Sequence, residues 1–436
     1  MADLIAHVLR RAGFDTTPDE YDSYQKLSFD ATLDRLVNYE QVTDDFEQQH
    51  ASDHYERKDL ATIQLLWLNR MLTTKRPLQE KMTLFWHGLF ATANYKVNSP
   101  DLMWKQNQLF RIHALSNFRT ILMEVAQDAA MLKWLDGDQN RKGRPNENFA
   151  REVMELFTLG IGNYTEQDIK EVARALTGWQ VSPTGVVAYN SNLHDGGSKT
   201  FLGRTGNFTL NDVVDAILAQ PAHATFLARR LFTYFANDHP SQTTIDGLAQ
   251  VYTGSNYEIK PLVFAILRSP EFTGKSSYRA RIKSPIELVL GTYKKFGIDQ
   301  VPKETPLILR RLGQEPFNPP TVKGWEEGAG WISTSTMLDR FNFANTVSRG
   351  RTPATDQWIA SLKKVAGTSV TAPNIVDYLA KTVLHGDLTD DIRKILIGYL
   401  QPADPKQPLA LTPDVVDTRV RAAAHLLLST PVHQLN

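Results

Sequence analysis

The feature that most constrains the fold is a succession of segments with helical period and helical length along nearly the whole chain. In residues 60–72 and 78–93, apolar side chains recur at the three- and four-residue spacing of a buried or amphipathic helix. Pro100 and Pro285 stand where helices can begin, because proline is tolerated in the first turn. We expect an all-α protein, a large orthogonal bundle of many helices.

Two long stretches interrupt this helical pattern. Residues 191–207 are rich in glycine, and residues 314–335 hold two tryptophans among prolines and glycines. Long ordered loops without regular structure are uncommon and are often functional. Residues 186–189 could form a short strand, so we expect at most a small β-hairpin. The best linker candidate is 401–408, which predicts one helical domain in 1–400 that carries the site and a C-terminal helix in 401–436 packed on it.

Composition excludes several classes of protein. The 48 lysines and arginines balance the 48 aspartates and glutamates, so no net field favours nucleic acid or an anionic membrane. The chain has no cysteine, which excludes disulfides, zinc–thiolate sites and a cysteine nucleophile. We expect no nucleic-acid partner and, from the lack of a long apolar run, no membrane span. The N-terminus lacks a signal-peptide pattern, so the expected location is cytoplasmic for the chain as written and extracytoplasmic if a leader was removed.

A dense polar stripe is predicted on the helix that follows Pro145. Asn146 is the expected N-cap, and Phe149 and Val153 belong to the apolar side of the helix. At 100° per residue, one face carries Glu147, Asn148, Arg151, Glu152 and Glu155. The stripe is either a solvated face, with Arg151 paired to Glu147 and Glu155 at i±4, or a buried cluster with perturbed pKa values on the wall of a cleft.

The glycine-rich loop carries His194, Asp195 and Lys199. If this loop folds over the polar stripe, Asp195 would face the glutamates across a cleft. One protonated and one ionised carboxyl group across a cleft are what glycoside hydrolysis needs. A structural network that locks the loop to the helix explains the same residues.

A metal site is a further hypothesis. His87, His113, His194 and Asp195 supply nitrogen and oxygen ligands suited to a divalent metal. No H-E-x-x-H or other local ligand signature is present, and no cofactor is identified. His87 follows Phe85 and Trp86 on an apolar helix, and the alternative is a histidine at the edge of the core, bonded to a backbone carbonyl.

Trp325 and Trp331 lie in the second irregular stretch, where local apolar partners are few. Such rings either anchor the loop on the body of the protein or form platforms for sugar rings. Lys323 and Lys199 would add positive charge to a substrate site there, which suits an anionic substrate. We therefore include Asn148, His87, Lys199, Lys323, Trp325 and Trp331 as candidate substrate-binding residues.

Several of these segments together resemble the bacterial family known as domain of unknown function 1800. The matching segments, in order along the chain, are 76–81 with 85–88, 140–166, 175–179, 194–208, 282–287 and 319–336. The resemblance implies no particular reaction, because members are mostly without assigned chemistry. It does imply that many relatives are exported and are encoded beside a sulfatase-like partner.

Three functions are consistent with the sequence. The first is a hydrolase or lyase acting on a carbohydrate-like or anionic polymer, with Glu147, Glu152, Glu155, Arg151, His194 and Asp195 as its catalytic cluster. The second is a non-catalytic binding or assembly module for a sulfatase-like or exported partner, in which the tryptophans form an interface. The third is a metal-dependent hydrolase that uses His87, His194 and Asp195.

Overall fold

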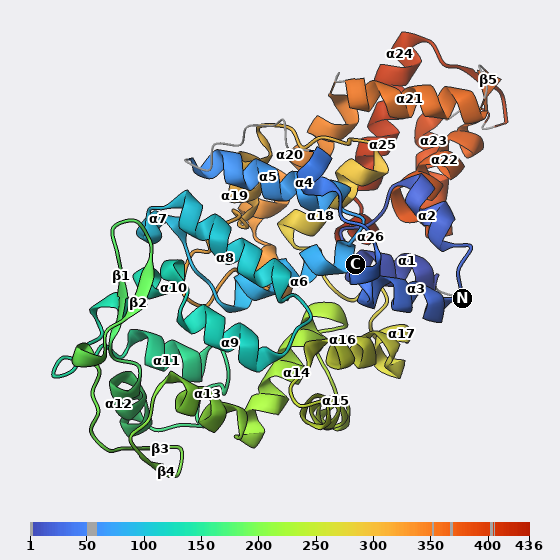
Figure 1. The fold of residues 1–436 in the computed structure, drawn as a ribbon. Coiled ribbons are helices and arrows are strands. Elements are labelled where there is room, and N and C mark those ends of the chain that lie inside the picture. The colour runs from blue at the N-terminus through green and yellow to red at the C-terminus, as the bar shows by residue number, and fades with distance from the viewer. Residues whose placement is uncertain (1–2, 50–58, 351–352, 367–368, 402–403, 405) are drawn as a thin grey trace.

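The computed structural model describes residues 3–49, 59–350, 353–366, 369–401, 404 and 406–436. Helices dominate the molecule, and the predicted all-α class is confirmed (Figure 1). The first half contains the helices α1 (Leu4–Arg11), α2 (Pro18–Tyr24), α3 (Phe29–Val37), α4 (Phe46–Gln49), α5 (Leu60–Thr73), α6 (Pro77–Leu89), α7 (Asn94–Val97), α8 (Pro100–Ile112), α9 (Phe118–Ala126), α10 (Ala129–Trp134), α11 (Asn148–Glu155) and α12 (Glu166–Ala175).

The second half continues the helical pattern to the C-terminus. It contains α13 (Leu210–Leu218), α14 (Pro221–Phe235), α15 (Gln242–Gly254), α16 (Ile259–Arg268), α17 (Pro270–Thr273), α18 (Pro285–Lys295), α19 (Thr305–Leu312), α20 (Thr334–Arg349), α21 (Pro353–Ala366), α22 (Ala372–Leu384), α23 (Asp390–Leu400), α24 (Pro413–Val415), α25 (Arg421–Leu428) and α26 (Pro431–Gln434). A π-helical turn over Val416–Val420 joins α24 to α25, and short 3₁₀ turns cover Tyr39–Gln41, Gly137–Gln139, Ser191–Leu193 and Gly328–Trp331.

The described residues contain more β-structure than the single small hairpin that the sequence suggested. Three antiparallel pairs are present: β1 (Trp179–Val181) with β2 (Val187–Tyr189), β3 (Lys199–Phe201) with β4 (Arg204–Gly206), and β5 (Ser369–Val370) with β6 (Leu409–Ala410). The β3–β4 pair forms inside the glycine-rich stretch because Leu202 and Gly203, both at positive φ, make a two-residue hairpin turn. Each strand is only two or three residues long, so the helical class is unaffected.

Two central helices, α6 and α18, organise the core. Pro77 opens α6, and a capping box between Ser284 and Glu287 opens α18, as the sequence pattern S-x-x-E predicts. Nearly every side chain of both helices is buried, and the buried apolar residues form a continuous cluster from α1 to α25. Both helices lie in the middle of the molecule in Figure 1.

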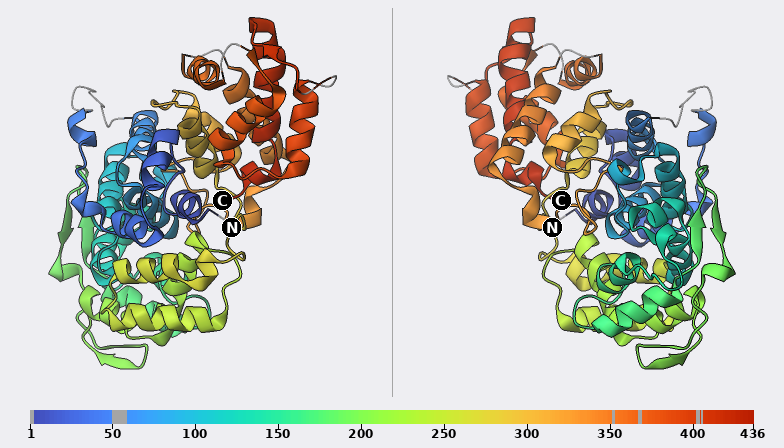
Figure 2. Two further views of the ribbon diagram at one scale, coloured as in Figure 1. Left: turned by 90° about the vertical axis from the view of Figure 1, so that its right-hand side faces the viewer. Right: turned by 90° about the vertical axis from the view of Figure 1, so that its left-hand side faces the viewer.

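The two ends of the molecule differ in character. Helices α21 to α25 gather on one side, whereas the β1–β2 and β3–β4 pairs lie on the opposite side, as the views in Figures 1 and 2 agree. The last long helix, α25, packs against α20, α22 and α23. The domain division at residue 400 stays a prediction, and residues 402, 403 and 405 of the proposed linker lie outside the described residues. None of the helices in the described ranges is both long and apolar enough to cross a bilayer.

Candidate functional site

The polar stripe of α11 is a partly exposed surface of the protein. The helix starts at Asn148, with Glu147 rather than Asn146 in the capping position, because the Asn146 side chain instead accepts a hydrogen bond from the Asn148 amide at 2.9 Å. Asn148 also donates to Asp136 at 3.2 Å. The apolar side of the helix, which includes Phe149 and Val153, is buried as predicted.

The ion pairs of the stripe differ in part from the predicted i±4 pattern. Arg151 is 3.4 Å from Glu147, but its strongest partner is Glu166 at the start of α12, to which it donates two hydrogen bonds of 2.8 Å. Glu155 accepts the hydroxyl of Tyr164 at 2.7 Å instead of pairing with Arg151. Arg151 therefore ties α11 to α12, because its guanidinium binds the carboxylate of Glu166 with both arms.

Glu152 differs from the other carboxylates of the stripe in its partners. It is half-buried, and among the described residues its side chain has no hydrogen-bond or ion-pair partner. Burial raises the pKa of Glu152, and the neighbouring charge of Glu155 raises it further, while Arg151 and Lys323 oppose the shift. The charge of Lys323, in the second irregular loop, therefore acts on Glu152.

The glycine-rich loop does not bring its charged residues to this stripe. Asp195 pairs with Arg174 of α12 at 2.8 Å, which lowers the pKa of Asp195 to about 2. His194 lies 3.0 Å from the carbonyl of Thr177, and Lys199 bonds to the carbonyls of Asp195 and Gly197. The hydrogen bonds and ion pairs of these three side chains, within the described residues, are with α12, the turn after it or the loop itself, and the His194 ring also packs against Tyr189 of β2. They anchor the loop.

His87 is a buried, uncharged residue. Burial lowers its pKa to about 3, and its Nε2 atom accepts a hydrogen bond from the Phe317 amide at 3.2 Å. The predicted carbonyl partner was wrong, because a neutral imidazole can accept as well as donate and the chain presents an amide here. The ring of Trp325 packs edge-on against His87, 5.1 Å between centroids. His87 therefore contacts the tryptophan loop at two residues, Phe317 and Trp325.

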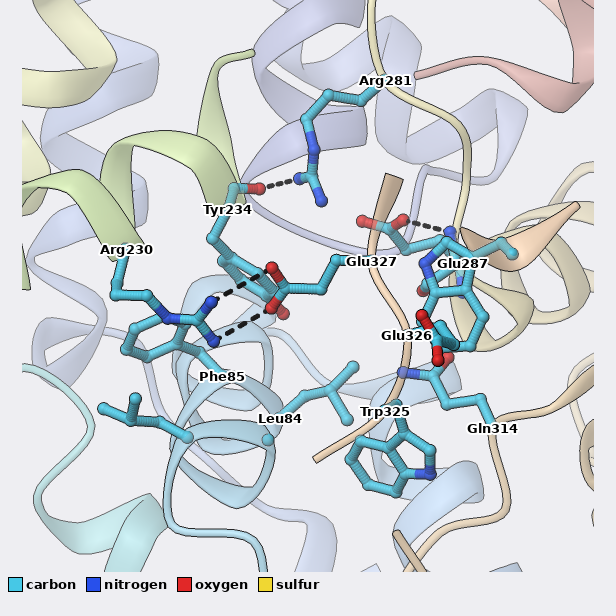
Figure 3. A pocket seen from close by; sticks show the side chains of 14 residues that line it. Leu84, Phe85, Arg230, Tyr234, Arg281, Glu287, Gln314, Trp325, Glu326 and Glu327 are labelled. Atoms are coloured by element: carbon cyan, nitrogen blue, oxygen red, sulfur yellow. Dashed lines mark hydrogen bonds and ion pairs between the residues drawn. The ribbon is translucent and has the colours of Figure 1, made fainter. Parts of the chain in front are cut away.

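The tryptophan loop, residues 314–335, closes over one side of a narrow pocket, which we call the tryptophan pocket. The empty space in it, together with open solvent at its mouth, is about 520 Å³. Figure 3 shows its walls converging from four parts of the chain: α6, α14, the start of α18 and the loop. Its lining residues are Leu84, Phe85, Gly88, Leu89, Arg230, Tyr234, Arg281, Ser284, Glu287, Gln314, Trp325, Glu326, Glu327 and Trp331.

The loop approaches α6 so closely because Gly324 lacks a side chain. Its φ is +89°, and a Cβ atom would lie only 2.5 Å from the carbonyl oxygen of Gly88. This contact places the half-buried Trp325 over Gly88, while Trp331 is buried. Three of the segments that carry the family resemblance, 85–88, 282–287 and 319–336, thus meet at one pocket.

The three carboxylates of the tryptophan pocket have different partners. Glu287 forms a buried ion pair with Lys81; although burial alone disfavours its charge, Lys81 and Arg281 lower its pKa to about 2. Glu327 accepts two hydrogen bonds from Arg230, at 3.0 and 3.2 Å, as the dashed lines in Figure 3 show. Glu326 is exposed and has no hydrogen-bond or ion-pair partner in the described part of the chain. Only Glu326 is therefore free to bind a ligand without breaking an ion pair.

Three polar donors of the pocket also lack partners. The indole Nε1 of Trp325 and the Nε atoms of Arg230 and Arg281 are buried and have no hydrogen bond within the described ranges. A buried donor without a partner lowers the stability of the folded protein. A ligand whose oxygen atoms accept hydrogen bonds from these donors would remove that penalty.

Sequence reasoning selected Trp325 and Trp331 for this pocket but missed most of its charged residues. Glu326 and Glu327 follow Trp325 directly, and Glu287 lies in the S-x-x-E pattern, so both signals were present in the sequence. Arg230 carries no local signal, because it lies on an ordinary amphipathic helix and reaches the pocket only through the fold.

The ligands of the hypothetical metal site do not converge. In the parts of the chain that the structure describes, no three histidine, aspartate or glutamate side chains come together to hold a metal ion. His87 is enclosed by Trp67, Phe317 and Trp325, and His194 contacts Thr177. The metal-dependent hypothesis is therefore not supported by these residues.

Comparison with known proteins identifies a family and nothing narrower. Neither the curated proteins nor the solved structures contain a match to this chain. A family model described as "Protein of unknown function (DUF1800)" matches residues 7–435. Because this match covers nearly the whole chain, the protein belongs to the DUF1800 family.

Proposed function

We propose that this protein is a hydrolase that acts on a carbohydrate-like polymer, with the tryptophan pocket as a sugar-binding subsite and Glu152 as the proton donor. The observation that carries the proposal is that residues of one loop act at two features. Its Trp325 lines a concave, carboxylate-containing pocket, and its Lys323, two residues earlier, acts on the half-buried Glu152. Substrate held by the loop would lie within reach of both.

The chemistry of the pocket suits a polyhydroxylated ligand. An indole ring packs against the apolar face of a sugar. Carboxylate groups accept hydrogen bonds from the sugar hydroxyls, and amide groups donate to them as well as accept from them. Trp325 supplies the ring, Glu326 a free carboxylate, and Arg281 an unpaired donor. The tryptophans line a hollow rather than a flat face, which favours a ligand pocket over the interface that an assembly module would need.

Glu152 suits general acid catalysis. A carboxyl group whose pKa is raised by burial keeps its proton nearer neutral pH and can give it to a leaving glycosidic oxygen. Glu147 and Arg151, also named in the sequence-based cluster, are committed to ion pairs and are assigned structural roles. The second carboxylate of the reaction is Glu155 or Glu326, which single substitutions would distinguish.

The test is a screen for new reducing ends with neutral, uronic-acid and sulfated polysaccharides, followed by matched variants on the active substrate. Glu152→Gln should lower kcat by on the order of 10²- to 10⁴-fold, the usual contribution of a general acid. Glu147→Gln is the control, because it lies on the same helix and should retain most of the activity. Trp325→Ala should raise KM without a comparable loss of kcat.

Two results would count against the proposal. Unchanged turnover in Glu152→Gln, with its fold intact by circular dichroism, would remove the proton donor. Unchanged affinity in Trp325→Ala would remove the pocket. If no polysaccharide is cleaved but one binds in a Trp325-dependent manner, the hydrolase assignment fails and the sugar-binding pocket remains.

A further inference from the structure

A second and larger pocket shares no lining residue with the tryptophan pocket. Its empty space, again with open solvent at the mouth included, is about 1610 Å³, roughly three times that of the tryptophan pocket. Its walls come from α2 and the residues before it, the end of α18, α21 and α22. Four aromatic side chains line it: Tyr21, Phe296, Trp358 and Tyr378. Such walls suit the flat body of a small molecule.

One edge of this pocket is a cluster of three buried, polar side chains. The Nζ atom of Lys295 is 3.0 Å from an oxygen of Asp15 and 3.3 Å from Nε2 of His385. The same imidazole nitrogen lies 3.3 Å from the hydroxyl of Thr16. The side chains of Asp15, Lys295 and His385 are each at most 5% exposed. Lys295 and His385 belong to the pocket wall.

The backbone at two of these residues is in an unusual conformation. Asp15 has φ +66° and His385 has φ +55°, in the left-handed region that favours glycine. His385 ends α22 in this conformation, and the ring of Tyr21 packs against its imidazole, 4.2 Å between centroids. Strained backbone conformations concentrate at functional sites, where side chains must be held in particular positions. Here the side chains of both strained residues, Asp15 and His385, contact Lys295.

The surroundings also change the chemistry of the lysine. Burial lowers the pKa of Lys295 to about 8; Asp15 opposes this shift, and the nearby charges of Arg10 and Arg279 add to it. A lysine with a lowered pKa has a larger share of the neutral, nucleophilic amine near neutral pH. Its neighbour Lys294 is equally buried but pairs with Glu20 at 3.2 Å and is not part of the pocket wall.

We propose that this pocket binds a carbonyl compound with a flat, apolar body and that Lys295 captures it as an imine. The neutral amine forms a bond to the carbonyl carbon, the carbon–oxygen double bond breaks, and the two amine protons leave with the oxygen as water. No other reactant is consumed. Asp15 and His385 are positioning residues that hold Nζ at the pocket wall. This site is independent of the proposed hydrolase site.

The test uses pyridoxal, an aromatic aldehyde, as the probe on the full chain. The imine is reduced with sodium borohydride, and the labelled lysines are identified and timed by peptide mass spectrometry. Lys170, exposed on α12 and outside this pocket, is the internal reference. Lys295 should be labelled on the order of tenfold faster than Lys170 near pH 7, because more of its amine is neutral. Pyridoxine, which has an alcohol in place of the aldehyde, should slow labelling at Lys295 and not at Lys170.

Two variants complete the design. Lys295→Arg keeps the positive charge beside Asp15 and should lose the fast labelling, whereas Lys294→Arg should retain it. Labelling of Lys295 no faster than Lys170 would overturn the proposal, as would a lack of protection by pyridoxine. These wild-type comparisons decide the question even if Lys295→Arg fails to fold.

Discussion

Helices α6 and α11 both carry charged side chains, but the fold places the two sets in opposite surroundings. On α6, the side chain of Glu80 is fully buried and so is that of Lys81. On α11 and at its N-terminal cap, the side chains of Arg151 and Glu147 are 35% and 38% exposed. In the sequence α11 has the denser cluster of charge, yet α6 carries the more deeply buried one. The density of charge in a helix therefore does not indicate its burial.

The charges of α6 are buried because distant helices supply their partners. Glu80 accepts hydrogen bonds from Trp67 of α5 and Arg111 of α8, and it lies 3.0 Å from Arg70. Although burial disfavours the charged form, these cations lower the pKa of Glu80. Lys81 pairs with Glu287 of α18. The two adjacent residues of α6 thus connect it to three other helices of the core.

The largest predicted effect is on this network. Glu80→Gln removes the carboxylate that Arg111 binds in the core and one of the two carboxylates beside Arg70, so the free energy of unfolding should fall by about 3–5 kcal/mol. Glu147→Gln, the matched change on α11, should alter it by less than about 0.5 kcal/mol. Urea unfolding of both variants measures the difference. Similar losses in the two variants would mean that the buried carboxylate of α6 contributes no more to the free energy of unfolding than the exposed one does.

The second prediction concerns His87, which lies near the end of α6. Its pKa in the folded protein, about 3, is below the usual 6.5, so the unfolded chain binds the proton first as the pH falls. Stability from this residue is therefore full above pH 6.5 and is lost between pH 6.5 and 3. At pH 4.5, about two units below the pKa of the unfolded chain, the loss of stability is about 2–3 kcal/mol, because each unit corresponds to about 1.4 kcal/mol.

His87→Gln tests this sign. A glutamine can still accept the Phe317 amide and does not titrate, so the variant should lose about 2–3 kcal/mol less stability between pH 7 and pH 4.5 than the wild-type protein does. Urea unfolding at the two pH values provides the measurement, with Glu147→Gln as the control that keeps the wild-type profile. An equal loss in His87→Gln and wild type would show that His87 is protonated without cost in the folded state.

The comparison also shows which parts of the structure could be predicted from the sequence. The apolar periodicity of residues 78–93 correctly predicted a central helix, and Pro285 correctly marked the start of α18, because helices and their first turns depend on local sequence. Arg111 lies 31 residues from Glu80, and Glu287 lies 206 residues from Lys81. No local pattern specifies such pairs. For the same reason the path of the glycine-rich loop was missed: Asp195 is held by Arg174, and nothing in the loop itself indicated which helix it would bind.

The smallest effect is predicted for the pair between Arg151 and Glu166, which joins α11 to α12 on the surface. Both side chains are solvent-accessible, 35% and 68% exposed, so water and salt screen their attraction. A double-mutant cycle with Arg151→Lys and Glu166→Gln should give a small coupling that disappears at about 1 M salt. A cycle on Glu80 and Arg111 should give a larger coupling that persists, because salt ions do not reach a buried pair. If the coupling between Arg151 and Glu166 also persists in salt, the ion pair of α11 is shielded from solvent more than its exposed fractions indicate. The charged residues of α11 and α6 would then differ less than the structure suggests.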